Sequence, residues 1–355
     1  MKILVMNGDG IGAEIVPEGR RCLEAASEAF DLGLTFQEDF IGFDAIRKYG
    51  HACPEEVIER IRDADGALFG PHNNVDYPPE HQSYANPSGI IRRGLHLHAN
   101  LRPSKTRQGV PAHVPEMDVV IARENMEGFY ADRNMHAGSG EFMANPNLAQ
   151  SIRNISRSAS TDIAVAGCEF AMQRRKKVSI IHKANVMKLT DGLWREACLD
   201  VTAKYPELEV EEVILDAFAA HIVRRPQDFD VVICSNMYGD IFSDLASELA
   251  GGLGLGGSIN ASHADCIAQC AHGSAPDIAG QNIANPTAMI VSAAMMLTWL
   301  AAKHGKPEFN KAANAMETAL SMQLADGRTR DLGGDMDCDA FGAAVAACIG
   351  DLSHK

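Results

Sequence analysis

Short β-branched segments alternate with amphipathic helical patterns, and this alternation constrains the fold more than any other feature of the chain. The first seventy residues contain, in order, KILVM, EIVPEGRRCLEAASEAF, LTFQEDF, CPEEVIERIRDA and GALFG. Parallel strands need crossover connections, and helices are the usual ones. The sequence therefore predicts an α/β fold with a mostly parallel sheet.

Three later segments also contain apolar strand patterns, and each pattern ends in polar residues. KKVSIIHKAN, EVEEVILDAFAAHIV and FDVVICSNMYGD each carry an apolar strand pattern that runs into a polar tip. In α/β enzymes the chemistry is placed outside the ends of buried strands. The middle segment ADRNMHAGSGEFMANPNLAQSI shows no clean period. We expect an arm there, near residues 131–152, that packs on a partner subunit.

Composition limits the classes of function. The chain has 355 residues, 46% of them hydrophobic, which favours two domains, and its net charge of −15 argues against nucleic acid or an anionic membrane as partner. Nine cysteines without a CxxC pair favour reduced thiols and a cytoplasmic location over a zinc or disulfide scaffold. The apolar run 288–302 is shorter than the roughly 20 residues of a membrane span and predicts a buried helix.

Two glycine-rich stretches invite a nucleotide-binding interpretation that their spacing does not support. NGDGIGAE at 7–14 follows a strand pattern, but its glycines are spaced G-x-G-x-G instead of G-x-G-x-x-G. GGLGLGG at 251–257 lacks the Lys and hydroxyl residues of a phosphate loop. We interpret the second stretch as a flexible link after a helix.

Three arginines suggest an anionic ligand in this acidic chain. Arg92 and Arg102 bracket the segment RRGLHLHANLR, and Arg123 follows in ARENMEGFY. The guanidinium group is planar, permanently charged and suited to bidentate binding of carboxylates. A polycarboxylate ligand fits this set, and surface salt bridges are the alternative.

Proton-transfer groups and hard metal donors complete a candidate constellation. Tyr130 and Lys183 can serve as acid and base when cations lower their pKa, although either residue alone is more often structural. Asp240 and Asp244 share one face of a predicted helix, and Asp216 ends another strand pattern. Three carboxylates match Mg²⁺ or Mn²⁺, while the alternative is a solvated helix face.

Taken together, these stretches resemble the isocitrate and isopropylmalate dehydrogenase family of metal-dependent β-decarboxylating dehydrogenases. The resemblance covers nearly the whole chain and rests on GDGIGAE, ANLRP, RENMEGFY, HKANVMKLTDGLW, NMYGDIFSDLASELAGGLGLGGSIN and HGSAPDIAGQNIANPTAMIVSAAMML. It implies a two-domain fold that is not the Rossmann fold. The large domain would comprise 1–98 and 252–355, the small domain 99–251, and the protein would be a homodimer with shared active sites.

The resemblance also implies roles for individual residues. Arg92, Arg102 and Arg123 would bind the malate carboxylates, and Asp216, Asp240 and Asp244 the metal, with Lys183 and Asp216 supplied by the neighbouring subunit. Lys183 would remove the hydroxyl proton and Tyr130 would protonate C3 after decarboxylation. The implied cofactor contacts are Asn185, His272, Gly273, Ala275, Asp277, Ile278 and Asn285.

The cofactor is expected to be NAD. Asp277 and Ile278 stand where NADP-dependent relatives carry Lys and Tyr. A carboxylate accepts hydrogen bonds from both ribose hydroxyls and repels a 2′-phosphate. A solvated turn after Pro276 is the alternative interpretation of Asp277.

Departures from the family pattern leave the substrate open. Gln269 stands three residues before His272, where relatives usually have Glu, so part of the ribose or nicotinamide contact is in question. Ser88 and Gly89 replace the leucines of isopropylmalate enzymes, and Asn86 and Ser88 offer hydrogen bonds to a polar C3 substituent. Isopropylmalate, isocitrate, homoisocitrate, tartrate and D-malate are all candidates. A non-catalytic regulatory subunit is the alternative of another class.

Overall fold

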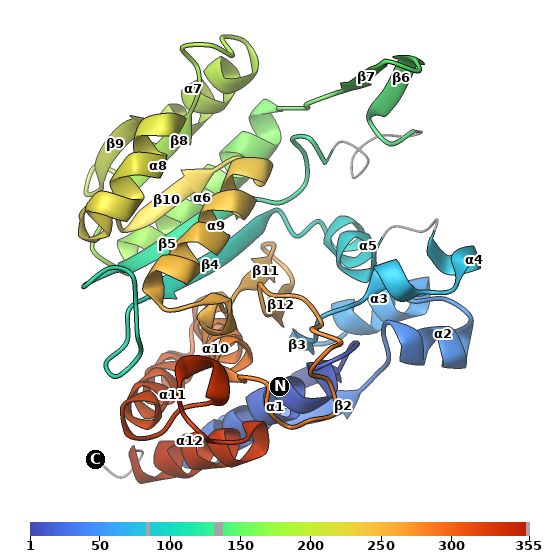
Figure 1. The fold of residues 1–355 in the computed structure, drawn as a ribbon. Helices are drawn as coiled ribbons and strands as arrows, with labels where there is room; N and C mark the ends of the chain where they lie inside the picture. Colours follow the sequence, from blue (N-terminus) through green and yellow to red (C-terminus); the bar gives the residue numbers. More distant parts are fainter. Residues whose placement is uncertain (83–85, 131–137, 353–355) are drawn as a thin grey trace. The chain divides into compact units, whose positions relative to one another are not determined.

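The structure is a computed structural model that describes residues 1–82, 86–130 and 138–352 (Figure 1). It divides into two compact units. Unit 1 comprises 1–95, 107–112 and 251–355, and unit 2 comprises 96–106 and 113–250. Part of the predicted arm, residues 131–137, lies outside the described residues.

Unit 1 contains five strands in the order β2-β1-β3-β12-β11, parallel except for β11. Its strands are β1 (Lys2–Met6), β2 (Thr35–Glu38), β3 (Gly66–Phe69), β11 (Ile259–Ala261) and β12 (Cys266–Gln269). Its helices are α1 (Gly12–Ala29), α2 (Phe43–Tyr49), α3 (Glu55–Arg62), α4 (Pro79–Gln82), α5 (Pro87–Gly94), α10 (Thr287–His304), α11 (Pro307–Asp326) and α12 (Cys338–Leu352), with 3-10 turns η1 (Asn74–Asp76), η4 (Leu253–Leu255) and η5 (Arg330–Leu332).

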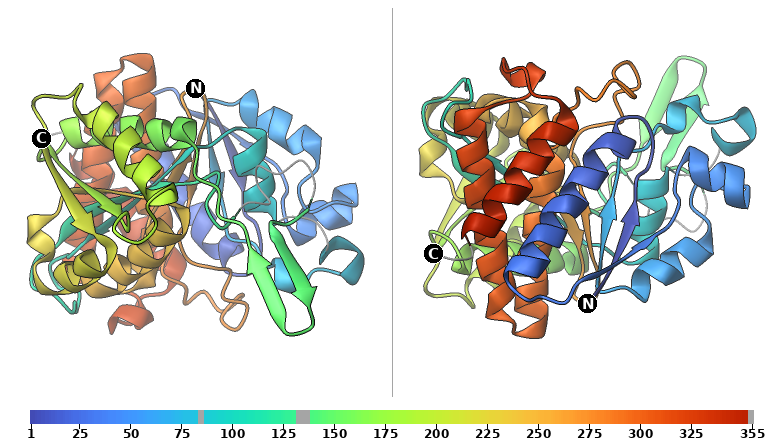
Figure 2. Two further views of the ribbon diagram at one scale, coloured as in Figure 1. Left: turned by 90° about the horizontal axis from the view of Figure 1, so that it is seen from above. Right: turned by 90° about the horizontal axis from the view of Figure 1, so that it is seen from below.

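Helices α1, α10, α11 and α12 pack side by side in unit 1 (Figure 2, right). The apolar run 288–302 forms most of α10, which is buried along nearly its whole length, as the sequence predicts. Gly19 of α1 allows close packing, because a Cβ there would lie 2.5 Å from Met289 Cγ. No helix among the described residues is long and apolar enough to cross a bilayer.

Unit 2 has the strand order β4-β5-β10-β8-β9, parallel except for the β4–β5 pair. Its strands are β4 (Ala99–Lys105), β5 (Asp118–Glu124), β8 (Lys177–His182), β9 (Glu209–Ile214) and β10 (Val231–Cys234), and β6 (Glu141–Asn145) pairs with β7 (Leu148–Ser151) in a separate antiparallel sheet. Its helices are α6 (Arg157–Met172), α7 (Thr190–Thr202), α8 (Leu215–Arg224) and α9 (Asn236–Ala250), with η3 (Pro226–Asp228).

The buried strands of unit 2 receive helices on both faces. Helix α6 contacts β5, β8 and β10, and Gly167 of α6 faces Ile233 and Ala122. The preceding residue of β10, Val232, belongs instead to an apolar cluster with Phe218 of α8 and Phe242 of α9. Successive strand residues point to opposite faces, so both faces of these strands are covered.

The mostly parallel α/β architecture is confirmed, and one local interpretation changes. The pattern EVEEVILDAFAAHIV is not one strand: β9 ends at Ile214, and Leu215 begins α8, which places Asp216 in the first turn of a helix. The glycine run follows α9, at the point where the chain passes from unit 2 into unit 1. Gly251 and Gly252 have φ of 135° and 126°, which disfavours any side chain there, and η4 follows.

Candidate active site

Arg102 and Arg123 lie on adjacent antiparallel strands of unit 2 and face the start of α9. Arg102 donates to Asn100 Oδ1 at 2.6 Å and Ser243 Oγ at 2.8 Å, and its Nη1 lies 3.3 Å from Asp240 Oδ1. Arg123 donates to Asn236 Oδ1 at 2.7 Å and also pairs with Asp240. Two of the three predicted arginines, Arg102 and Arg123, therefore meet two of the three predicted aspartates, Asp240 and Asp244, in one cluster.

The cations of this cluster are more deeply buried than the anions. The side chains of Arg102 and Arg123 are 7% and 2% exposed, whereas Asp240 is 34% and Asp244 56% exposed. Burial and the neighbouring Arg123 lower the pKa of Arg102 to about 10. Burial also raises the pKa of Asp244, because its desolvation outweighs the attraction of Arg102. Two buried guanidinium groups with solvent-facing counterions can accept a carboxylate ligand.

Tyr130 joins the same cluster. Its hydroxyl donates to Asp240 Oδ2 at 2.9 Å, and the Arg123 guanidinium carbon lies 5.6 Å from its ring centroid. Gly239 permits this packing, since a Cβ there would lie 2.7 Å from Arg123 Cγ. The phenol thus lies against the Arg123 guanidinium with its hydroxyl on the Asp240 carboxylate, and its O–H group is a candidate proton donor.

Lys183 and Asp216 form a second cluster, fixed by strand register. β8 and β9 are parallel and pair His182 with Ile214, so the residues that follow each strand are neighbours. Lys183 Nζ forms an ion pair with Asp216 Oδ1, and this bond lowers the pKa of Asp216. Asp216 is 71% exposed, so its carboxylate can bind a further ligand. Asn185 is also exposed in this segment.

The three predicted metal ligands are not gathered within one chain. Asp240 and Asp244 lie on one face of α9, whereas Asp216 lies on α8. In the described part of the chain, no three acidic, His or Cys side chains converge as a metal site. The carboxylate oxygens of Asp240 and Asp244 are donors that Mg²⁺ or Mn²⁺ prefers. A complete set of metal ligands needs at least one further donor besides these two side chains.

In unit 1 the segment 272–285 is held by the glycine-rich turn after β1. Ile11 N donates to Ser274 O at 2.9 Å, and Gly280 N donates to Glu14 Oε1 at 2.5 Å. A Cβ on Gly10 would lie 2.0 Å from Ser274 O. The GDGIGAE stretch therefore supports the predicted cofactor loop through its close backbone packing.

The predicted cofactor residues differ in how many hydrogen bonds they make within the chain. Asn285 donates to Asp331 Oδ2 at 2.9 Å and accepts from Thr287 N at 3.0 Å. Asp277 is exposed, and its backbone oxygen accepts a hydrogen bond from Gln281. The other predicted contacts lie on the same loop: His272, whose pKa is lowered by burial, exposed Gly273, Ala275 with φ 39°, and half-buried Ile278.

The predicted substrate residues of unit 1 lie on or beside α5. Asn86 Oδ1 caps the helix by accepting from Gly89 N at 2.7 Å, which leaves its amide NH₂ for a ligand. Ser88 is buried and donates to Gln269 Oε1 at 3.1 Å. Burial lowers the pKa of His72 to about 4, and the positive charge of Arg92 contributes to the shift.

Sequence reasoning missed several residues that shape these sites. Asp331, which binds Asn285, belongs to the polar stretch RTRDLGG, and this dense polar run was the available signal. The contact between Ser88 and Gln269 spans 181 residues and left no local signal. Arg153 and Asp191 were also missed: they form an ion pair, and Asp191 accepts a hydrogen bond from the backbone N–H of Lys183.

Comparison with known proteins identifies the family of this chain. Residues 2–345 match the family described as isocitrate/isopropylmalate dehydrogenase. The chain is 40% identical to isocitrate/homoisocitrate dehydrogenase of Thermus thermophilus over 99% of both chains. It is 37% identical to 3-isopropylmalate dehydrogenase of Sulfurisphaera tokodaii over 95% of this chain and 96% of the relative.

A solved structure gives the same result. The crystal structure of isocitrate dehydrogenase from Methylococcus capsulatus matches with a TM-score of 0.85 and 33% identity, covering 98% of this chain and 99% of that one. Sequence and fold agree over nearly the whole length. The chain therefore belongs to the isocitrate/isopropylmalate dehydrogenase family of oxidoreductases.

Proposed function

We propose that the protein catalyses NAD-dependent, divalent-metal-dependent oxidative decarboxylation of a 3-substituted malate to a 2-oxo acid and carbon dioxide. The observation that carries the proposal is the cluster in which buried Arg102 and Arg123 face exposed carboxylates beside Tyr130. Such a cluster combines anion binding, hard metal donors and a proton donor. A regulatory subunit without catalysis would not need this combination.

The chain's own residues account for binding and proton transfer. Arg102 and Arg123, with Arg92, bind the substrate carboxylates, and Lys183 takes the proton of the 2-hydroxyl. A metal ion would be held by Asp216, Asp240 and Asp244 and would supply Lewis-acid stabilisation of negative charge on the substrate, and NAD held at 272–285 would supply the hydride acceptor. Tyr130 then delivers a proton to C3 of the decarboxylated product.

The protein acts as a homodimer in this proposal, with Lys183 and Asp216 of one copy serving the active site of the other. Asp216 is paired with Lys183 and is not clustered with the aspartates of α9 in the described residues. Large apolar side chains are exposed on unit 2, including Val186, Leu189 and Ile241. Exposed apolar surface of this kind favours burial against a second copy.

The proposed C3 substituent is small or polar. Ser88 and Gly89 provide little apolar surface for an isopropyl group, and a hydrophobic contact changes selectivity by only about 1–3 kcal/mol. Specificity constants for isopropylmalate, isocitrate, homoisocitrate, tartrate and D-malate test this with purified protein. We expect one of the last four to be preferred. A preference for isopropylmalate would contradict the pocket argument, and no turnover of any of them would contradict the proposed activity.

The proposed cofactor preference rests on Asp277. Its exposed carboxylate is available to accept hydrogen bonds from the ribose hydroxyls, and it would repel the 2′-phosphate of NADP. Specificity constants should favour NAD strongly, and Asp277→Lys with Ile278→Tyr should erode or reverse that preference. Equal use of both cofactors by the unaltered protein would show that Asp277 does not face the ribose.

A further inference from the structure

A buried ion pair in unit 2 lies between the segments that carry Lys183 and Tyr130. Arg153, just before α6, pairs with Asp191 in the first turn of α7, and their side chains are only 7% and 1% exposed. Arg153 also donates to Thr190 Oγ1 at 3.1 Å and to Ser235 Oγ at 3.3 Å. The pair thus joins α7, the segment before α6 and the segment before α9.

Asp191 fixes the backbone of Lys183. Its Oδ2 accepts a hydrogen bond from Lys183 N at 2.6 Å. The intervening turn is closed by Met187 N, which donates to Lys183 O at 2.9 Å, and by Asp191 N, which donates to Met187 O at 3.0 Å. The position from which the Lys183 side chain reaches out is therefore set by the Asp191 carboxylate.

Arg153 contacts the residue next to Tyr130. The guanidinium carbon of Arg153 lies 5.9 Å from the ring centroid of Phe129 and 5.2 Å from that of Tyr238. Beside it, Asn154 and Gly128 exchange backbone hydrogen bonds of 2.9 and 3.0 Å. The chain leading to Tyr130 is thus held through cation–π contact and a short backbone bridge.

We infer that Arg153 and Asp191 are positioning residues that set the geometry of both proton-transfer groups. One carboxylate oxygen of Asp191 binds the Lys183 backbone, the other binds Arg153, and Arg153 in turn packs on Phe129. Displacement of a catalytic group by about 1 Å can cost about a hundredfold in rate. The catalytic part of this inference rests on the proposed function.

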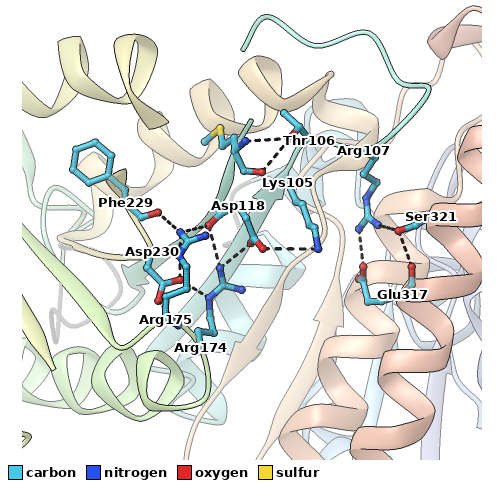
Figure 3. Close-up of polar contacts among 11 residues, drawn as sticks. Lys105, Thr106, Arg107, Asp118, Arg174, Arg175, Phe229, Asp230, Glu317 and Ser321 are labelled. Atoms are coloured by element: carbon cyan, nitrogen blue, oxygen red, sulfur yellow. Dashed lines mark hydrogen bonds and ion pairs between the residues drawn. The ribbon is translucent and has the colours of Figure 1, made fainter. Parts of the chain in front are cut away.

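The chain offers a matched control at the opposite end of the same strands. Arg174 donates to Asp230 Oδ1 at 2.7 Å, and Asp230 is 1% exposed, as buried as Asp191 (Figure 3). Asp230 also accepts from Arg175 N at 2.9 Å, so both aspartates combine an ion pair with a backbone bond. Asp191→Asn and Asp230→Asn therefore each remove one buried negative charge, the first near Lys183 and the second at the opposite end of the strands.

Hydrogen exchange of the unliganded protein tests the positioning directly. We expect Asp191→Asn to accelerate amide exchange in both 183–189 and 126–130. Arg153→Lys keeps a charge for Asp191 but loses the planar group that contacts Phe129, so we expect faster exchange mainly in 126–130. Asp230→Asn should leave both segments unchanged. If Asp191→Asn does not fold, the exchange rates of 126–130 in Arg153→Lys still test the inference.

Kinetics supply the second measurement, with the preferred substrate of the five-compound panel. In Asp191→Asn and Arg153→Lys we expect kcat to fall about tenfold to a hundredfold while KM for substrate changes by less than about threefold. Asp230→Asn should keep kcat within about twofold. Unchanged exchange in both segments, or a folded Asp191→Asn protein with normal kcat, would overturn the inference. If the unaltered protein turns over none of the compounds, the proposed function fails, and the exchange data alone decide the positioning.

Discussion

The two edges of the sheet in unit 2 carry the same residue types in opposite arrangements. At the amino edge, where β5 and β10 begin, a buried carboxylate is covered by arginines: Asp230 is 1% exposed, and Arg174 and Arg175 are 21% and 47% exposed (Figure 3). At the carboxyl edge, Arg123 is 2% exposed and its partner Asp240 is 34% exposed. In these two ion pairs the more deeply buried partner is the carboxylate at the amino edge and the guanidinium at the carboxyl edge.

This difference separates a structural cluster from a binding cluster. At the amino edge Asp118 and Asp230 bind both arginine side chains and the Arg175 backbone, so the arginines are already bonded to chain groups. At the carboxyl edge the buried Arg123 can exchange its solvent-facing partner for an anionic ligand without losing its bonds to Asn236. Ligand chemistry is therefore expected at the carboxyl edge alone.

The largest expected effect is that of Lys183→Met, which removes the proposed base. General base catalysis contributes about a hundredfold to ten-thousandfold, so the initial rate of NADH formation should fall at least about a hundredfold. Lys176→Met, at the opposite end of β8, removes only an exposed ion pair with Glu207 and should leave the rate within about twofold. Similar losses of rate in the two variants would contradict the assignment of the chemistry to the carboxyl edge.

Asp240→Asn comes next, because it weakens the metal site and releases Arg123 and Tyr130 from a shared partner. Neutralising one carboxylate ligand should raise the metal concentration needed for half-maximal activity about tenfold to a hundredfold. Titration with Mg²⁺ and Mn²⁺ measures this. Asp118→Asn, which loses Arg174 at the amino edge, is the control and should show no change in metal dependence. Metal dependence that is the same in Asp240→Asn and the unaltered protein would remove Asp240 from the metal site.

Tyr130→Phe should have the smallest effect and the most selective one. It removes the proposed proton donor to C3, so we expect the forward decarboxylating rate to fall about tenfold to a hundredfold, with a smaller effect on reduction of the ketone. Tyr205→Phe changes a phenol that follows α7, far along the chain from the proposed chemistry, and should be neutral. Equal slowing of ketone reduction and decarboxylation by Tyr130→Phe would show that its assigned role is wrong.

The sequence predicts the architecture and the residue types of the site because both leave local signals. Alternating apolar patterns predict β1, α1, β3 and the buried α10, and strand ends predict where Lys183 and Asp240 stand. The boundary between β9 and α8 is hidden, since apolar residues continue from the strand into the buried face of the helix. Helix α2 was not anticipated.

Contacts between distant segments could not be predicted in this way. Arg153 and Asp191 are 38 residues apart, and neither stands in a motif that indicates an ion pair. Gln269 was noticed only as a departure from relatives, and its bonds to Ser88 and Asn260 depend on how β11, β12 and α5 pack. Such contacts follow from tertiary packing, which a local pattern does not encode.

Metal-dependent turnover tests the central claim, that the carboxyl edge of unit 2 carries the chemistry of an oxidative decarboxylation. NADH and carbon dioxide would be measured together for purified protein with the preferred substrate, before and after removal of metal by a chelator. We expect one carbon dioxide per NADH, loss of both products in excess chelator, and recovery of both when Mg²⁺ or Mn²⁺ is restored. Undiminished NADH formation in excess chelator, or NADH without carbon dioxide, would contradict it.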